Sequence, residues 1–182
     1  MANTKNDRKR MAAGIYARLS LVVAAVLLVI GGVFWAAGNF AKSQVKTQLS
    51  AQNIYFPDKG SAALDPEEFP DLQKYAGQRV DDGVKAQAYA DGFIGRHLKN
   101  VAAGKTYSEV SALAMKDPKN TALQQQKQTL FQGETLRGLL LGDGYGYWTM
   151  GVLAQYAAWA CFVAAGCLVL IAYWQATRSK KA

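Results

Sequence analysis

No charged side chain interrupts residues 19–41, which read LSLVVAAVLLVIGGVFWAAGNFA. A second uncharged run, GYGYWTMGVLAQYAAWACFVAAGCLVLIAYWQAT, covers residues 144–177. About 20 apolar residues are enough for a helix to cross the hydrocarbon core of a bilayer, which is about 30 Å thick. Both runs exceed that length. The sequence therefore predicts one transmembrane helix over residues 19–41 and a second one, with a glycine hinge before it, over residues 144–174.

The formal net charge of +8 is concentrated beside these two runs. The amino-terminal tail, residues 1–18, has a net charge of +4, and the carboxy-terminal tail, residues 175–182, has a net charge of +3. Basic flanks mark the cytoplasmic side of a membrane protein, so both termini are predicted to be cytoplasmic and residues 42–143 extracytoplasmic, in the cell membrane. The charges on which this topology depends are Arg8, Lys9, Arg10, Arg18, Arg178, Lys180 and Lys181.

Residues 42–143 have a net charge of only +1, with the two signs interspersed, which excludes the basic face of a nucleic-acid-binding domain. A cleaved secretory signal is the alternative for the first run. A signal core has about 7–15 apolar residues, whereas this run is longer, so an uncleaved anchor is favoured.

Aromatic and small side chains agree with two membrane spans. Trp and Tyr favour the depth of the lipid headgroups, and the residues predicted to lie there are Tyr16, Trp35, Tyr147, Trp148, Tyr173 and Trp174. Small residues allow helices to pack closely in lipid. Those predicted to do so are Gly31, Gly32 and Gly38 in the first span, and Ala154, Ala158, Cys161 and Ala165 in the second. The pattern leaves open whether this packing is within the chain, between copies or with another protein.

The segment between the spans has a helical pattern. Ala41, Val45 and Leu49 recur every four residues, which predicts that the first helix continues beyond the membrane. Three prolines predict a loop over residues 56–70. A helix is expected over about residues 71–101, broken near Gly77 or Gly83, with residues 86, 90, 93, 94, 97, 98 and 101 on one face.

Two further helix starts are predicted before the second span. Thr106 and Glu109 have the spacing of a capping box, and the helix after them is expected to turn Val110, Leu113 and Ala114 inward. Asp117-Pro118 is expected to end this helix and to cap the next one. Residues 142–146, GDGYG, are expected to form a flexible hinge. The predicted fold is therefore an all-α membrane protein in which two transmembrane helices flank an extracytoplasmic domain of three to four helices.

No catalytic or metal-binding constellation is evident. His97 is the only histidine, so neither a Ser-His-Asp triad nor a typical zinc site can be assembled. Asp81 and Asp82 are adjacent, and adjacent residues on a helix diverge by about 100°, so they favour a helix start over an ion site. Glu134 and Arg137 are spaced to pair on a helix surface. We therefore predict no enzyme activity, no cofactor and no metal.

The segment resembles an uncharacterised family of actinobacterial two-span membrane proteins. The resemblance rests on ALDPEEFPDLQKYAGQRVDDGVKAQAYADGFIGRHL, KTYSEVSALA and TLFQGETLRGLLL, and covers residues 63–141 with the flanking spans. It implies a bacterial plasma membrane and no known activity. Some members have a ring-opening dioxygenase label, which implies two histidines and a carboxylate as metal ligands. A chain with one histidine does not fit that label.

These features favour a non-enzymatic accessory, scaffold or assembly protein that presents an extracytoplasmic helical domain to an envelope partner. Its predicted partners are the lipid bilayer and either another membrane or envelope protein or a second copy of itself. A ligand sensor that acts through a partner is the first alternative. A small channel or transporter component is the second, although neither span contains an intramembrane charge.

Overall fold

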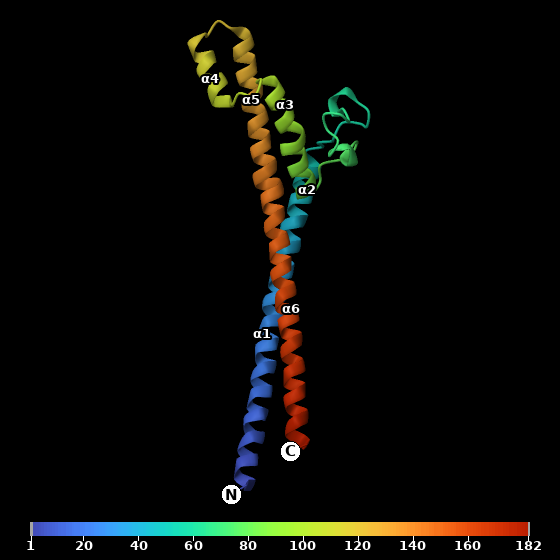
Figure 1. Ribbon diagram of the computed structural model, residues 1–182, viewed down its shortest axis with the longest axis vertical. Helices are drawn as coiled ribbons and strands as arrows, with labels where there is room; N and C mark the ends of the chain where they lie inside the picture. The colour runs from blue at the N-terminus through green and yellow to red at the C-terminus, as the bar shows by residue number, and fades with distance from the viewer. Residues whose placement is uncertain (1, 182) are drawn as a thin grey trace. The chain divides into compact units, whose positions relative to one another are not determined.

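The computed structural model describes the backbone of residues 2–181 and the side chains of residue 8 and residues 10–178 (Figure 1). Within these residues every named element is helical, and there is no strand. The only strand-like pairing in the described part of the chain is an isolated antiparallel bridge between Tyr55 and Arg79. The prediction of an all-helical chain is confirmed.

Two compact units make up the chain. One is a helical hairpin, residues 1–40 and 151–182, and the other is a helical domain, residues 41–150. Helix α1 (Ala2–Ala51) and helix α6 (Tyr147–Lys181) supply the hairpin and each extends into the helical domain. The stretches Arg10–Ala51 and Thr121–Arg178 are helical and are long and apolar enough to cross a membrane. The chain therefore has two candidate membrane-spanning helices, as a two-pass membrane protein requires.

The hairpin is held together by small residues that repeat every seven positions. The backbones approach so closely there that a Cβ atom added at Gly31 would lie 2.6 Å from the Phe162 ring, and one at Gly38 would lie 2.6 Å from the Gly151 carbonyl oxygen. A seven-residue repeat keeps one helix face against its partner along a left-handed supercoil. We call this repeat the hairpin seam; its buried members are Ala17, Ala24, Gly31 and Gly38 on α1 and Gly151, Ala158, Ala165 and Ala172 on α6.

The helical domain begins with the end of α1, where Ala41, Val45 and Leu49 are all buried, as the four-residue spacing predicted. The proline-rich segment after α1 has only one helical turn before residue 70, the 3₁₀ turn Ala62–Leu64. Its Phe56 is 1% exposed and stacks on Tyr75, with ring centroids 5.2 Å apart. The segment is therefore a loop, as predicted, but an ordered one that contributes side chains to the core.

The expected helix over residues 71–101 is broken before Gly83. A 3₁₀ turn, Gln73–Tyr75, leads into Gly77, whose φ of +67° favours glycine and ends the turn. Helix α2 (Gly83–Gln87) then starts at Asp82, whose carboxylate accepts a hydrogen bond from the Lys85 amide at 2.8 Å. This places the aspartate pair at a helix start, as its sequence position indicated.

A π-helical segment, Ala88–Ile94, joins α2 to helix α3 (Gly95–Val101). Its i+5 to i hydrogen bonds insert an additional residue into the turn. As a result, side chains exactly four residues apart stay on the buried side, namely those of residues 86, 90, 94, 98 and 102. The sequence pattern, which assumed a regular helix, wrongly placed His97 and Val101 on that face; both are exposed.

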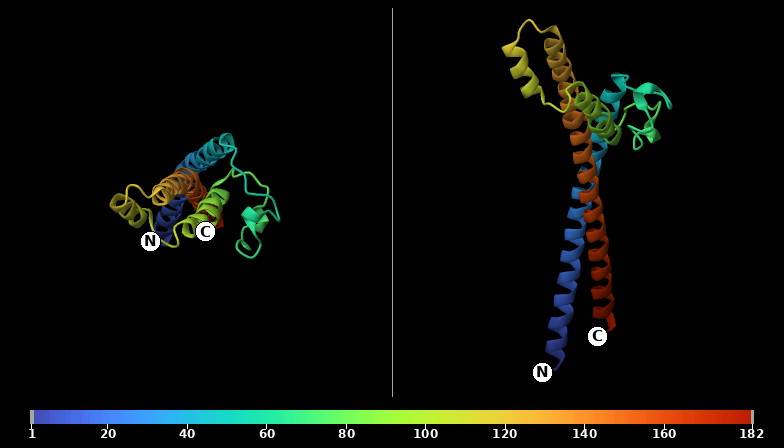
Figure 2. Two further views of the ribbon diagram at one scale, coloured as in Figure 1. Left: turned by 90° about the horizontal axis from the view of Figure 1, so that it is seen from above. Right: turned by 45° about the horizontal axis from the view of Figure 1, so that its top comes forward.

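Helix α4 (Tyr107–Lys116) begins with the predicted capping box. The Glu109 amide donates to Thr106 Oγ1 at 3.3 Å, and the Thr106 amide donates to Glu109 Oε2 at 2.7 Å. Val110 and Ala114 are buried as predicted, but Leu113 is 39% exposed. α4 packs against α5 (Figure 2), and the expectation that Leu113 turns inward is wrong because its side chain lies outside the buried side of α4.

Helix α5 (Thr121–Leu139) starts three residues later than predicted. Asn120, rather than Asp117, is its cap, because Asn120 Oδ1 accepts from the Leu123 amide at 3.1 Å. Asp117 instead closes α4: its amide donates to the Leu113 carbonyl oxygen at 3.1 Å. The expectation that Asp117-Pro118 caps the second helix is therefore wrong.

The glycine-rich segment expected to be a hinge is helical. Residues Leu140–Gly146 form a second π-helical segment that continues from α5 into α6. Gly144 is buried, and a Cβ atom added there would lie 3.0 Å from the Ala86 Cβ atom. The absence of a side chain thus lets α2 pack closely against this segment, so the glycine serves packing rather than a break in the helix.

Candidate functional site

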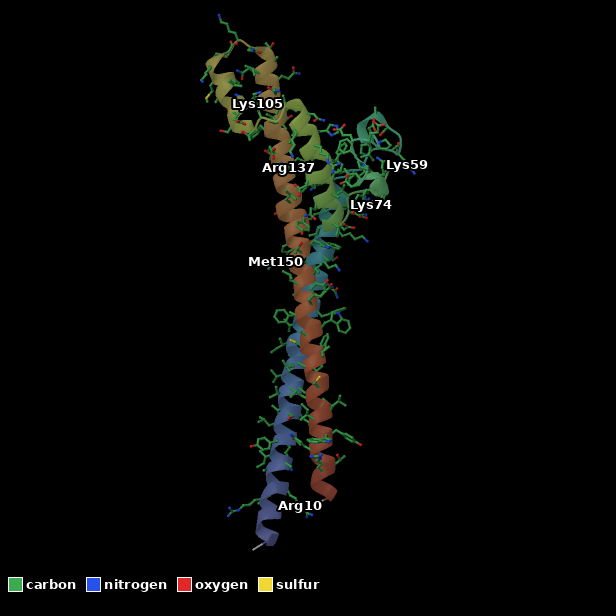
Figure 3. All side chains as sticks on the ribbon, in the orientation of Figure 1. Arg10, Lys59, Lys74, Lys105, Arg137 and Met150 are labelled. Carbon is green, nitrogen blue, oxygen red and sulfur yellow. The ribbon has the colours of Figure 1, made fainter. Side chains whose placement is uncertain are left out.

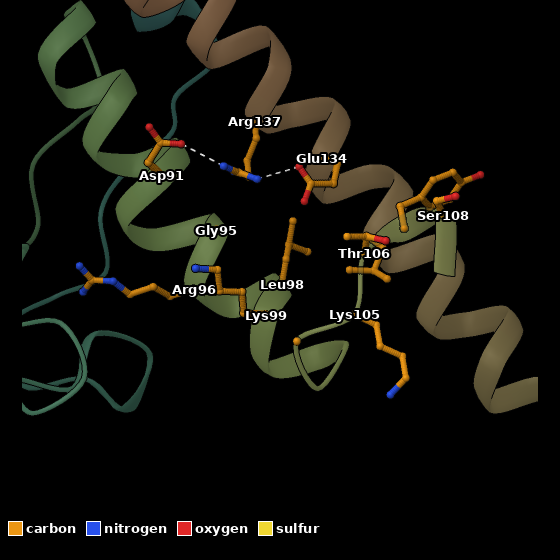
Figure 4. Close-up of a pocket in the computed structure, with 13 residues that line it drawn as sticks. Asp91, Gly95, Arg96, Leu98, Lys99, Lys105, Thr106, Ser108, Glu134 and Arg137 are labelled. Carbon is orange, nitrogen blue, oxygen red and sulfur yellow. Dashed lines mark hydrogen bonds and ion pairs between the residues drawn. The ribbon is translucent and has the colours of Figure 1, made fainter. Parts of the chain in front are cut away.

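A cavity of about 640 Å³ lies in the helical domain between α3, the start of α4 and the middle of α5 (Figure 4). This volume lies within the range typical of small-molecule pockets. Leu98 and Leu130 line part of its wall. The charged residues that line it are Asp91, Arg96, Lys99, Lys105, Glu134 and Arg137.

Arg137 lines this cavity and has polar contacts with three other residues. Its guanidinium lies between two carboxylates, with Asp91 Oδ1 at 3.0 Å and Glu134 Oε2 at 2.7 Å (Figure 4). Its Nε–H also donates to the Ala90 carbonyl oxygen, at 3.1 Å, in the first π-helical segment. The predicted pairing of Glu134 with Arg137 is present, and the contact with Asp91 additionally links α5 to the segment before α3.

Electrostatics favour the charged form of this cluster. Partial burial by itself disfavours a charged guanidinium, but the hydrogen bond to Asp91 and the charges of Glu134 and Asp91 raise the pKa of Arg137 overall. Arg96, which also lines the cavity, donates to both Asp71 carboxylate oxygens, at 2.8 and 2.9 Å. The hydrogen bond from Arg96 lowers the pKa of Asp71.

Two further cations line the cavity. Among the described residues, Lys99 and Lys105 form no ion pair, and both are exposed. The cavity thus has two neutralised guanidinium groups and two ammonium groups available to an anion. This arrangement is suited to holding a charged group, because the two ammonium groups can pair with an anion.

His97 lies outside this cavity. Its ring stacks on Phe69 and contacts Phe93, with centroids 5.5 and 4.6 Å apart, and Nδ1 is 3.2 Å from the Phe93 carbonyl oxygen. Asp81 and Asp82 both form an ion pair with Lys85, and Asp82 in addition accepts the Lys85 amide at the start of α2. Within the described residues, no group of three His, Cys, Asp or Glu side chains is placed to hold a metal ion.

The residues predicted to pack the membrane helices are divided by the structure. Gly31 and Gly38, together with Ala158 and Ala165, belong to the hairpin seam. Ala154 and Cys161 are half-buried beside it. Gly32 is exposed, and a Cβ atom added there would meet no atom within 4 Å. Gly32 therefore lies outside the seam, because it follows Gly31 by about 100° around the helix.

A polar pair within the hairpin adds to the seam. The Gln155 side-chain amide donates to Asn39 Oδ1 at 2.7 Å. Trp35, a predicted headgroup anchor, contacts Trp159 edge to face, with centroids 5.6 Å apart. Both contacts join α1 to α6, so this part of the hairpin is linked by polar and aromatic groups as well as small ones.

The other predicted anchors differ in surroundings. Tyr16, Tyr147, Tyr173 and Trp174 are exposed, and Arg178 lies 3.8 Å over the Trp174 ring. Trp148 packs into the helical domain instead: its side chain covers Gly83, and Lys42 lies 5.0 Å above its ring. Among the predicted topology charges, Arg8, Arg10, Arg18 and Arg178 are exposed, whereas the side chains of Lys9, Lys180 and Lys181 lie outside the described residues.

Sequence reasoning missed the bond between Arg137 and Asp91, because no local pattern links residues 46 positions apart. The seven-residue repeat of the hairpin seam was a detectable signal, since glycine or alanine occupies every seventh position from residue 17 to 38 and from residue 151 to 172.

No protein-family model matches the chain, and neither a curated protein nor a solved structure matches it. The resemblance to actinobacterial two-span proteins therefore stays a prediction. The class of protein is defined by the fold alone: an all-helical chain with two candidate membrane-spanning helices and a compact helical domain.

Proposed function

We propose that the chain is a two-pass membrane protein that presents its helical domain, outside the cytoplasm, to a protein of the cell envelope and catalyses no reaction. The observation that carries the membrane part is the uncovered apolar surface of the hairpin (Figure 3). Val29 is 68% exposed and Leu170 is 69% exposed. An apolar surface of this kind is costly in water and matched by lipid.

The proposed orientation is supported by the basic ends of the chain. Arg8, Arg10, Arg18 and Arg178 are exposed, and the acidic residues are confined to Asp7 and to residues 58–143. By the positive-inside rule, both ends belong to the cytoplasm and the helical domain to the other side.

A partner for the helical domain is supported by apolar side chains that its own core leaves uncovered. They lie on α4 and α5, and include Met115, which is 69% exposed, and Phe131, which is 52% exposed. Exposed Met and aromatic residues are enriched where proteins bind one another, because they are large, apolar and adaptable.

Topology is tested first, in a cysteine-free background, C161A/C167A. Single cysteines replace Lys119, in the turn between α4 and α5, and Arg10, near the start of α1. A membrane-impermeant maleimide applied to intact cells is expected to label K119C alone, and to label R10C only after lysis. Labelling of R10C in intact cells, or extraction of the protein from membranes by alkaline carbonate, would contradict the proposal.

The partner is tested with a photo-crosslinking amino acid at Phe131, in the native membrane. The matched control carries the same group at Lys59, which is exposed in the proline-rich segment of the same domain. We expect a discrete adduct at residue 131 and none at residue 59, with its mass separating a second copy of the chain from another protein. No adduct at residue 131, or the same adducts at both sites, would count against presentation to a partner.

Ligand sensing is a second proposal, supported by the cavity around Arg137. Its volume of about 640 Å³ and its unpaired Lys99 and Lys105 suit a small anion. A thermal-shift screen of the full chain in detergent with small carboxylates and phosphates is expected to find a stabilising compound whose effect K99Q/K105Q abolishes. A screen without such a compound would decide against sensing and leave the presentation proposal standing.

A further inference from the structure

At the end of the hairpin nearest the chain termini, α1 and α6 enclose a groove of about 480 Å³. Each helix contributes four residues with the same spacing: residues 14, 17, 18 and 21 on α1, and residues 169, 172, 173 and 176 on α6. These are the helix faces that meet in the hairpin seam, and half of these residues are glycine or alanine. A Cβ atom added at Gly14 would meet no atom within 4 Å, so the groove is open at this point.

The groove is apolar apart from the phenol of Tyr173 and one cation, Arg18. Among the described residues Arg18 forms no ion pair. No acidic residue occurs anywhere in α6, and the single one in α1, Asp7, is three helical turns from Arg18. A guanidinium beside an apolar groove, without a carboxylate of its own chain, is complementary to a ligand with an anionic head and an apolar chain.

We propose that this groove binds one anionic phospholipid of the cytoplasmic leaflet, with the phosphate on the Arg18 guanidinium and an acyl chain along Leu21, Val169 and Ala172. The guanidinium matches a phosphate because it donates two parallel hydrogen bonds. Basic pockets between transmembrane helices on the cytoplasmic side are established sites for anionic headgroups. The proposal rests on the two-pass topology proposed above, which places Arg18 at that leaflet.

The test is native mass spectrometry of the full chain, purified in a neutral detergent and supplied with equal amounts of phosphatidylglycerol and phosphatidylcholine of the same acyl chains. We expect bound phosphatidylglycerol to predominate. R18Q is expected to lower the ratio of bound phosphatidylglycerol to phosphatidylcholine about tenfold, the loss of a charge-assisted hydrogen bond. G14F is expected to reduce binding of both lipids, because its ring occupies the groove.

Two matched variants serve as controls. R10Q removes a charge from the same tail without touching the groove, and G32F adds the same ring at another open glycine of α1. Neither is expected to change lipid binding more than about twofold. If R10Q lowers the ratio as much as R18Q, the tail attracts lipid by its overall charge and the groove is not the site. If G14F binds lipid like the unmodified chain, the lipid does not lie in this groove.

Failure of this inference is distinguishable from failure of the proposed function. A chain that resists carbonate extraction and labels only at K119C, yet shows no preference for phosphatidylglycerol, keeps its two-pass topology and loses the lipid site. A chain that fails the topology test loses both.

Discussion

Arg137→Met tests how the charged cluster contributes to the helical domain, because it removes the guanidinium and keeps an apolar stem. The ion pair with Asp91, whose side chains are 26% and 47% exposed, contributes less than about 1 kcal/mol after solvent screening. The pair with Glu134, three residues away, adds about 0.4 kcal/mol. The hydrogen bond to the Ala90 carbonyl oxygen adds about 1 kcal/mol. The free energy of unfolding is thus expected to fall by about 2 kcal/mol.

The assay is urea unfolding of the full chain in neutral detergent, followed by circular dichroism at the helix band. Since the unfolding free energy of a small domain changes by about 1–3 kcal/mol per molar urea, the midpoint should fall by about 1 M. Lys119→Met is the control, because this exposed lysine lies in the turn between α4 and α5; its effect should stay within about 0.5 kcal/mol.

A double-mutant cycle separates the ion pair from the other contacts of Arg137. If Arg137 acts through Asp91, the effects of R137M and D91N will not add, and their coupling energy will be about 0.5–1 kcal/mol. Strict additivity of the two, or an unchanged midpoint for R137M alone, would refute the assignment of Arg137 as a link between α5 and the segment before α3.

Four further variants probe local features with the same urea assay. Thr106→Ala removes the cap of α4 and should cost about 1 kcal/mol; an unchanged midpoint would show that the capping box contributes nothing. Gly83→Ala should destabilise by about 1–3 kcal/mol because its Cβ atom would lie 2.3 Å from the packed tryptophan side chain. Gly138→Ala, where no atom lies within 4 Å, should instead stabilise α5 by up to about 1 kcal/mol, and equal signs for the two glycines would contradict this packing. Arg96 lowers the pKa of Asp71 in the folded chain, so the stability contributed by this pair is present at neutral pH and is lost as the pH falls below about 4. Asp71→Asn should therefore lower the midpoint at pH 7 and have less effect at pH 3; an equal effect at both pH values would rule out the charge as its cause.

Elements set by neighbouring residues could be read from the sequence. The capping box is an example, because Thr106 and Glu109 satisfy each other's backbone amides within one turn. The inward positions of Ala41, Val45 and Leu49 followed from their spacing. Asp117 shows the limit of this reasoning. Asp117 and Asn120 are both acceptable N-cap residues for the helix that follows. Asn120 is the N-cap of α5 because Asp117 is already the C-cap of α4.

Most contacts of the candidate site could not be predicted from the sequence. Glu134 and Arg137 could be paired because they lie one helical turn apart, whereas Asp91 reaches Arg137 only through the packing of the segment before α3 on α5. The cavity exists because α3, α4 and α5 meet around these side chains, and no local pattern specifies such a meeting.

The sequence by itself determined that this protein is helical and that two of its helices can cross a membrane, because length and uninterrupted apolar composition are properties of the chain alone. Only the tertiary structure decided which small residues pack. Gly31 is buried against Phe162 while Gly32 is exposed, although the two are chemically identical neighbours. The physical reason is that adjacent helical residues point about 100° apart, so only the position of the partner helix distinguishes them.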